Sequence, residues 1–200
     1  NTVGFLVDAL KDESEYARRA AVEVLNEIGD ESSVKDLLNA IKDDDWWVRS
    51  RAGDALAEIG GPKVVDAVVA LIRDQDEEIR RTAIEILNTT KDPRAVDGLI
   101  KATDDPDWWV KERAIDALAK LGSTKALPHL EKMLGTDPRT DTVLVRAIGK
   151  LGSQKHITKI LPMLNSRERD VQVEAIKAIS SLADETHAET IRGVLQKIKE

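Results

Sequence analysis

Apolar residues recur along the chain with a repeat of 31 residues. The segment DDDWWVRSRAGDALAEIG, residues 43–60, returns almost unchanged at residues 105–122 as DPDWWVKERAIDALAKLG, and residues 76–87 fit the same frame halfway between them. In each repeat one segment is apolar at a first position, called the anchor here, and again at +4, +7, +8 and +11. These positions share one stripe of an α-helix, so each repeat is predicted to contain one amphipathic helix of this type, the B helix.

Six repeats follow from this frame, the fifth shortened by one residue, and their anchors are Ala17, Val48, Ile79, Val110, Thr140 and Val171. A second segment between successive B helices is apolar at i, i+3, i+4 and i+7, as in Val65, Val68, Val69 and Ile72, and is predicted to form the A helix. One further A helix is expected at each end of the chain. Because a single helix pair cannot bury both stripes, neighbouring repeats must stack. The sequence predicts an all-α fold: a right-handed α-solenoid of stacked antiparallel helix pairs, with six B helices and seven A helices.

The repeats are expected to form a single domain over residues 1–200. Their predicted limits are residues 1–29, 30–60, 61–91, 92–122, 123–152 and 153–184, with a terminal helix over 185–200. The chain has no initiator Met and enters an apolar run at residue 3, which suggests an excerpt from a longer protein.

Helix ends are marked by residues that suit them. Gly29, Gly60, Gly122 and Gly152 stand where a helix takes a left-handed residue after its last turn, and Asp residues at 43–45, 76, 105, 107 and 137 are expected to cap B-helix N-termini. Pro162 falls late in its A helix and is expected to kink or end it. The position after the anchor holds Arg18, Arg49, Arg80 and Lys111, for which a ladder of Asp–Arg pairs between repeats is the favoured explanation.

Composition narrows the classes of partner. The chain is 42% hydrophobic and 34% charged, as amphipathic helices require, and its net charge of −7 repels nucleic acid and anionic membranes. It contains no cysteine, which excludes thiolate metal sites and suits a reducing compartment, so we expect a cytoplasmic protein. Its three histidines all fall in A-helix segments, and no phosphate-binding loop, nucleophile elbow or metalloprotease sequence is present. The sequence therefore predicts that the protein is not an enzyme and that it binds neither a cofactor nor a metal ion.

The repeat resembles a known class. Val48-Arg49, Ala52, Ala55-Leu56 and Ile59-Gly60, with their counterparts from Val110 to Gly122, are similar to the short HEAT-like repeats of bacteria and archaea. That class includes the repeats of the phycobilin-lyase type and those used for artificial binders. The resemblance implies that B helices line the concave face, and that binding residues lie at −2, −1, +2, +6 and +10 from the anchor.

These positions give a predicted partner-binding surface. Its members are Tyr16, Trp46, Trp47, Asp54, Glu58, Arg81, Glu85, Trp108, Trp109, Glu112, Asp116, Arg146, Lys150 and Lys177. Trp and Tyr are frequent binding anchors, and we expect Trp46 and Trp108 to contact a partner. For Trp47 and Trp109 the alternative is that each covers the junction with the preceding repeat. The surface is acidic in the first four repeats and basic in the last two, which predicts a bipolar groove that orients its partner; the alternative is a solvated face.

The leading hypothesis is a noncatalytic scaffold that binds an extended or helical segment of another protein on its concave face. One alternative, allowed by the resemblance, is attachment of a bilin chromophore or a chaperone role, as in phycobilin lyases. A second is DNA binding, as in HEAT-like alkylpurine glycosylases. That function calls for a continuous basic groove, and the acidic first four repeats argue against it.

Overall fold

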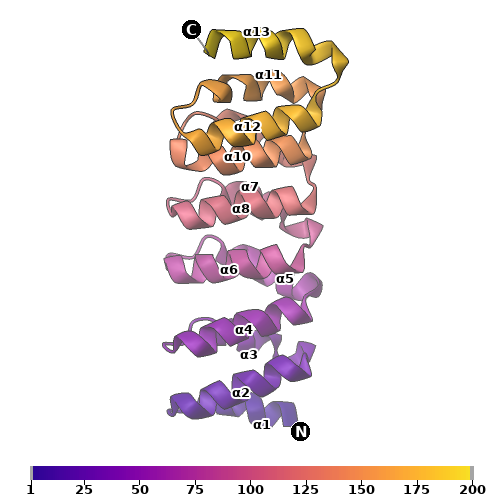
Figure 1. Cartoon of the computed structure of the whole chain (residues 1–200). Coiled ribbons are helices and arrows are strands. Elements are labelled where there is room, and N and C mark those ends of the chain that lie inside the picture. The colour runs from indigo at the N-terminus through magenta and orange to yellow at the C-terminus, as the bar shows by residue number, and fades with distance from the viewer. Residues whose placement is uncertain (1, 199–200) are drawn as a thin grey trace. The chain divides into compact units, whose positions relative to one another are not determined.

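The fold is entirely helical in the part of the chain that is described. The computed structural model describes residues 2–198, which form thirteen α-helices, six 3-10 helices and no strand (Figure 1). The predicted all-α solenoid of helix pairs, with six B helices and seven A helices, is confirmed.

All six B helices are 14 residues long, and each begins two residues before its anchor. They are α2 (Glu15–Ile28), α4 (Trp46–Ile59), α6 (Glu77–Thr90), α8 (Trp108–Leu121), α10 (Pro138–Leu151) and α12 (Arg169–Leu182). Their stripes are buried: Val48, Ala52 and Leu56 of α4 have no exposed surface, like Val110, Ala114 and Leu118 of α8. The shared apolar frame therefore sets both the length and the facing of these helices.

The A helices are shorter and less uniform. They are α1 (Thr2–Ala9), α3 (Val34–Ala40), α5 (Gly61–Leu71), α7 (Val96–Ala102), α9 (Leu127–Met133), α11 (Ile157–Ile160) and α13 (Ala188–Ile198). Five of them follow a 3-10 turn: η1 (Glu31–Ser33), η2 (Pro93–Ala95), η3 (Thr124–Ala126), η4 (Gln154–His156) and η6 (Glu185–His187). After α11 the chain continues as the 3-10 helix η5 (Leu161–Asn165), because Pro162 has no N–H to continue an α-helix. The predicted effect of Pro162 is confirmed.

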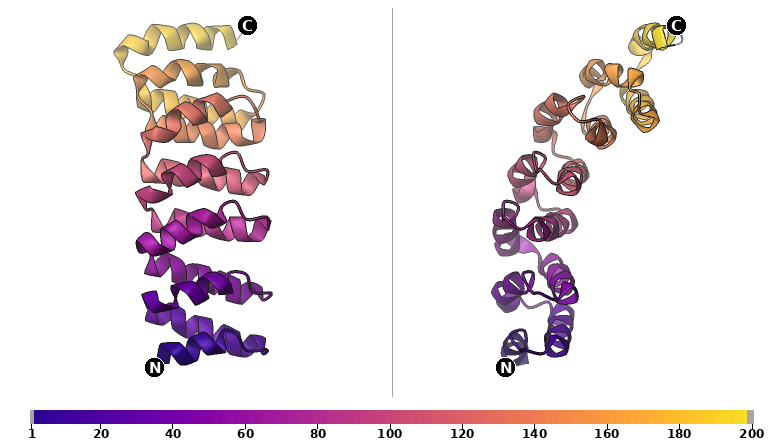
Figure 2. Two further views of the ribbon diagram at one scale, coloured as in Figure 1. Left: turned by 180° about the vertical axis from the view of Figure 1, so that it is seen from behind. Right: turned by 90° about the vertical axis from the view of Figure 1, so that its left-hand side faces the viewer.

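The chain divides into two compact units, called the N-terminal half (residues up to 102) and the C-terminal half (residues from 103). In the N-terminal half α2, α4 and α6 pack side by side, and in the C-terminal half α8, α10 and α12 do so. Within each half the B helices form one layer and the A helices the other (Figure 2). That residues 1–200 act as one repeat domain stays a prediction.

The glycines after the B helices do not all take the predicted conformation. Gly29 and Gly122 are left-handed, with φ of 61° and 70°, as expected. Gly60 has φ of 57° but ψ of −150°, because α5 begins at the next residue. Gly152 is extended, with φ of −80°, so the prediction is wrong there. A Cβ at Gly152 would lie 2.6 Å from the Ile148 carbonyl oxygen and 3.2 Å from the His156 ring, so glycine supplies space at this position.

Aspartate carboxylates cap the N-termini of α4, α6, α8 and α10, as predicted. Asp45 Oδ1 accepts hydrogen bonds from the backbone N–H groups of Trp47 and Val48 at 3.0 and 3.1 Å. Asp76, Asp107 and Asp137 each accept from the N–H two residues ahead. These caps satisfy N–H groups that have no partner inside the helix, and they fix where each helix begins.

The side chain after the anchor ties the preceding linker to the B helix. Arg18, Arg49 and Arg80 each donate from Nη1 to the carbonyl six residues upstream, at 2.9, 2.7 and 3.0 Å. Gln172 makes the same bond to the Ser166 carbonyl, and Asp141 accepts from the Gly135 N–H. The predicted Asp–Arg ladder is present between the first two repeats, where Arg18 donates to both oxygens of Asp43 at 2.9 and 3.0 Å. Arg49 bonds linker carbonyls instead.

A matched pair of glycines tests how closely the B helices pack. A Cβ at Gly149 of α10 would lie 2.6 Å from the Ala178 Cβ, whereas a Cβ at Gly53 of α4 would meet Thr82 at an ordinary 3.4 Å. We expect Gly149→Ala to lower the free energy of unfolding by about 1 to 3 kcal/mol through overpacking. We expect Gly53→Ala to leave it unchanged or raise it by up to ~1 kcal/mol through helix propensity. Denaturant melts of both variants measure this, and equal effects would contradict the close approach.

Acid titration tests the cap of α4. Arg19 donates to both oxygens of Asp45, the shortest bond being 2.6 Å, and these bonds lower the pKa of Asp45 from 3.8 to about 2. Because the folded-state pKa is lowered, this stabilisation is complete above about pH 4 and is lost as pH falls towards 2. The free energy of unfolding should therefore fall less steeply with acid in Asp45→Asn than in the parent chain. Asp66→Asn, at an exposed carboxylate of α5, should retain the parent slope.

Candidate partner-binding surface

Among the predicted surface residues of the N-terminal half, the aromatic side chains are exposed. Tyr16, Trp46 and Trp47 occupy the first turns of α2 and α4, and 74%, 62% and 37% of their surfaces are exposed. Asp54 and Glu58 of α4 are exposed, whereas Arg81 and Glu85 of α6 are half-buried. The aromatic side chains are accessible because the helix starts before the apolar stripe does.

The two tryptophans of α4 form an ordered cluster with an arginine. The rings of Trp46 and Trp47 meet edge to face, with centroids 5.5 Å apart and an interplanar angle of 85°. Arg51 lies over the Trp47 ring, its Cζ 5.4 Å from the centroid, and donates to both oxygens of Glu23 on α2 at 2.8 and 2.7 Å. It also donates to Asp54 at 3.1 Å. Trp47 therefore supports a charged link between two repeats and keeps part of its surface open.

Sequence reasoning missed Arg51 because its position, three residues after the anchor, lies outside the expected set. A signal was available in the sequence, since both tryptophan-bearing repeats place an arginine four residues after the second Trp. In α8 the Cζ of Arg113 lies 5.2 Å from the centroid of the Trp109 ring, which repeats the arrangement. The i, i+4 spacing brings the two side chains onto the same helical face.

The B-helix surface of the N-terminal half is strongly acidic. Its acids are Glu15, Glu23, Glu27, Asp54, Glu58, Glu77, Glu78 and Glu85, and its bases are Arg19, Arg51 and Arg81. Each base is bound by a carboxylate: Arg19 by Asp45, Arg51 by Glu23, and Arg81 by Glu78 at 2.9 Å. The bonds from Arg51 lower the pKa of Glu23 and keep it ionised. The surface thus presents a surplus of negative charge.

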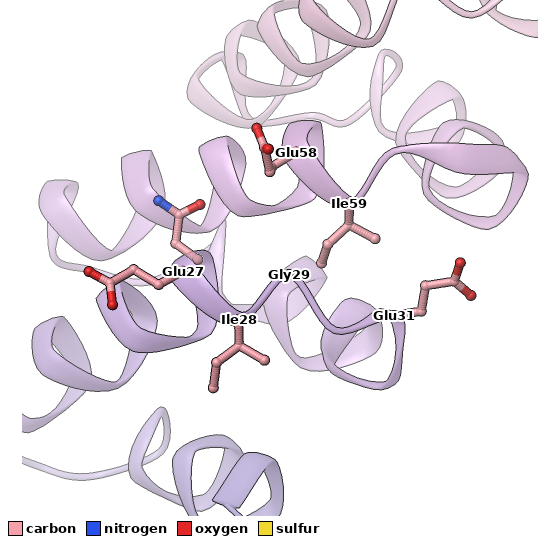
Figure 3. Close-up of a pocket in the computed structure, with 7 residues that line it drawn as sticks. Glu27, Ile28, Gly29, Glu31, Glu58 and Ile59 are labelled. Carbon is pink, nitrogen blue, oxygen red and sulfur yellow. The ribbon is translucent and has the colours of Figure 1, made fainter.

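An acidic hollow of about 550 Å³ lies at the carboxyl ends of α2 and α4 (Figure 3). Glu27, Glu31 and Glu58 line it together with Ile28 and Ile59. In Figure 3 the three carboxylates point in different directions. Across the described residues no three or more His, Cys, Asp or Glu side chains are arranged to hold a metal ion.

Predicted surface residues of the C-terminal half come from three helices. Trp108 of α8 is 53% exposed and Trp109 is half-buried beneath Arg113. Glu112 and Asp116, also on α8, are half-buried. Burial, and then the charge of Asp116, raise the pKa of Glu112, while the guanidinium of Arg146 on α10 opposes this shift. Acidic and basic members of the predicted set are therefore close enough to interact.

Arg146, Lys150 and Lys177 gather around a hollow of about 250 Å³ between α10 and α12. Glu174, which sequence reasoning did not include, lies among them. Arg146 Nε is 3.5 Å from one oxygen of Glu174 and Lys177 Nζ is 2.9 Å from the other. Those two bases, Lys177 first, lower the pKa of Glu174. Three of the predicted bases therefore line one hollow, together with a carboxylate that the prediction did not include.

The histidines make local contacts at separate places. His156 is buried and its Nδ1 accepts the Ser153 N–H at 2.8 Å, next to Gly152. His129 Nε2 lies 3.4 Å from Asp104, and His187 Nδ1 lies 2.7 Å from Asp184. These contacts fit roles in loop structure. In residues 2–198 no helix has the length and apolarity needed to cross a membrane.

Comparisons with known proteins agree with this architecture. Among solved structures, the chain is similar to an engineered protein (24% identity, TM-score 0.59, covering 91% of this chain and 96% of that one). It is also similar to a chain in the complex of CpcE and CpcF of phycocyanin lyase from Nostoc sp. PCC7120 (21%, 0.58, 94% and 80%). A third similar structure is a designed armadillo repeat protein in complex with the peptide (KR)4 (19%, 0.58, 92% and 100%). At these identities the similarity establishes the fold alone.

Sequence comparison establishes the family. A search of curated proteins finds no match. The family profile of HEAT repeats matches residues 3–76 and 65–144, which together make up more than half of the chain. The 14-residue B helices and their stacked A helices are the structural form of the same repeats. The chain therefore belongs to the HEAT repeat family.

Proposed function

We propose that this chain is a noncatalytic scaffold that binds an extended or helical segment of another protein on its B-helix surface. The observation that carries the proposal is the cluster at the start of α4, where Trp46 leaves 62% of its surface in water. Tryptophan, tyrosine and arginine are the side chains most enriched among binding hot spots, and this cluster combines two tryptophans with an arginine.

The cluster is organised before any partner arrives. Trp46 rests on the edge of Trp47, Arg51 covers the Trp47 ring, and Glu23 holds Arg51 from the neighbouring helix. A side chain already held in one orientation loses little entropy on binding, so more of its contact energy contributes to affinity. This supports a role for Trp46 as an anchor.

The charge of the N-terminal half indicates the chemistry of the segment it binds. Its B-helix surface has an excess of carboxylates, so a segment rich in Lys and Arg is the complementary ligand. The similar designed armadillo protein in complex with (KR)4 supports the idea that a solenoid can hold such a peptide. Trp46 and Glu58 lie 12 positions apart on α4, about 18 Å, a length that five or six extended residues span. The same excess of negative charge disfavours nucleic acid and anionic membranes as partners. We also propose a cytoplasmic location, because the chain contains no cysteine.

A second candidate is attachment or chaperoning of a bilin, favoured by the similarity to the phycocyanin lyase structure. Incubation with a bilin tests it. A bilin absorbance band that remains with the protein after gel filtration would support this function, and its absence would leave peptide binding as the sole proposal.

Removal of the exposed indole tests the anchor. We expect Trp46→Ala to weaken binding of an alternating Lys–Arg peptide by about 2 kcal/mol, roughly 30-fold, the usual scale for a hot spot. Because the ring is exposed, the free energy of unfolding should hardly change. Fluorescence anisotropy and denaturant melts measure the two quantities. Phe5→Ala removes another exposed aromatic ring, from the A helix α1, and is the matched control. A large loss of stability with unchanged binding would make Trp46 a structural residue.

Charge reversal tests the acidic surface. Glu27 and Glu58 are exposed and make no ion pair in the described structure. Glu27→Lys combined with Glu58→Lys therefore weakens the negative field of this surface without breaking an internal ion pair. We expect this double variant to slow association with the Lys–Arg peptide about tenfold at low salt, with a smaller effect on dissociation. The control, Asp8→Lys with Asp66→Lys, makes the same change in net charge on A helices. Stopped-flow fluorescence measures the association rate. The same rate at low and high salt, in the parent chain and in both double variants, would contradict electrostatic recognition.

A further inference from the structure

We infer that the hollow between α10 and α12 binds a phosphorylated serine or threonine of a partner protein, in a segment whose neighbouring residues are neutral or basic. This inference rests on the proposed function, because it names a ligand for the B-helix surface of the C-terminal half. It uses residues of that half alone.

The hollow exists because two small residues let the helices meet. A Cβ at Gly149 would lie 2.6 Å from the Cβ and 3.0 Å from the Cα of Ala178, so α10 and α12 touch at this level. The equivalent residues of the other B helices are larger: Asn26, Ala57, Asn88, Ala119 and Ser180. With no side chain at 149, about 250 Å³ stays open beside the contact. A compact group enters this space more easily than a broad one.

Three bases converge on this space from two helices. Arg146 and Lys150 are four residues apart on α10 and so share one face, while Lys177 faces them from α12. Glu174 offsets one charge and leaves a net charge of two positive units around the hollow. A phosphomonoester carries about −1.5 to −2 charges at neutral pH, which matches this surplus better than a single carboxylate does. Arginine adds paired N–H donors suited to phosphate oxygens.

Acidic residues lie on two sides of this positively charged hollow. Towards the amino ends of the same two helices lies a second hollow, of about 310 Å³, where Arg139 is outnumbered by Glu168 and Asp170. Asp137 also faces Arg139, with 3.6 Å between Oδ1 and Nε. On the side of α8, Glu112 acts on Arg146 and Asp116 lies one turn further on. A run of acidic residues would meet repulsion on both sides, whereas one phosphate flanked by neutral or basic residues would not.

The same surroundings favour a protein ligand over a lipid headgroup. The net charge of −7 and the acids that border the hollow oppose approach to an anionic bilayer. A flexible peptide can instead place one phosphate in the hollow and set its basic neighbours beside Asp116 and Asp170.

Glu174 gives the inference a distinctive consequence. Its carboxylate is held by Arg146 and Lys177, the bases that a phosphate needs, so it competes with the ligand. Replacing it with an amide should strengthen binding. A role confined to holding the helices together would give no gain in affinity.

The test uses the full 200-residue chain and a short fluorescent peptide with one phosphoserine between lysine and alanine residues. Peptides with serine or glutamate at that place are compared by fluorescence anisotropy. We expect the phosphoserine peptide to bind at least about tenfold more tightly than either of them, as expected for new charge-assisted hydrogen bonds. We expect Lys150→Gln and Lys177→Gln to weaken its binding about three- to tenfold and Glu174→Gln to tighten it about threefold.

Controls separate this site from general charge effects. Lys159→Gln removes an exposed lysine from α11 and should leave affinity unchanged. Lys150 makes no ion pair among the described residues, so Lys150→Gln breaks no internal salt bridge, and denaturant melts verify that each variant folds. Equal affinity for the three peptides, an equal effect of Lys159→Gln, or weaker binding by Glu174→Gln would each overturn the inference. So would binding to vesicles containing phosphoinositide without binding to the phosphopeptide.

The outcome is independent of the test in the N-terminal half. Trp46→Ala should leave phosphopeptide affinity unchanged, because Trp46 belongs to the other half. If the phosphopeptide fails to bind while Trp46→Ala still weakens Lys–Arg peptide binding, the inference about the hollow fails alone. If Trp46→Ala has no effect on Lys–Arg peptide binding, the proposed anchor fails regardless of the result with phosphoserine.

Discussion

Burial of two apolar stripes by each helix pair is the constraint on which this structure depends. A B helix of 14 residues turns Val48, Ala52 and Leu56, or their equivalents, towards its A helix and its neighbours. One pair leaves part of that surface in water, so neighbouring repeats within each half rely on one another for their core. The opposite side of each B helix does not pack into the core. Side chains there are free to vary in size and charge, and this is where the candidate binding residues lie.

Hydrogen bonds at the linkers fix the helix starts, which the burial of apolar stripes alone does not specify. A carboxylate caps each of four B helices, and the side chain after the anchor often bonds the backbone six residues upstream. Together they fix the residue at which the helix starts. Because Trp46 and Trp108 are the first residues of their helices, the same bonds fix where the indole rings emerge. Local capping thus connects directly to the position of the proposed anchor.

Charges on the B-helix surface act in two ways. Some bases are held by acids of a neighbouring repeat, as Arg51 is by Glu23 and Arg146 by Glu174. Partly exposed pairs of this kind add little to stability, but they orient side chains and keep carboxylates ionised. The remaining charges supply a field: negative on the N-terminal half and locally positive at Lys150. Each proposal therefore combines one shaped contact with local charge opposite in sign to the group that binds there.

The sequence by itself determined the repeat, the seven A and six B helices, the capping Asp residues and the exposure of Trp46 and Trp108. All of these depend on neighbours within one helix or one linker. The tertiary structure decided what depends on the distance between repeats. It paired Arg51 with Glu23 and placed Glu174 among the predicted bases. It also opened the hollow beside Gly149 and Ala178. Apolar periodicity fixes which face of a helix is buried, but the approach of two helices follows from the side-chain volumes that meet between them, which no local pattern encodes.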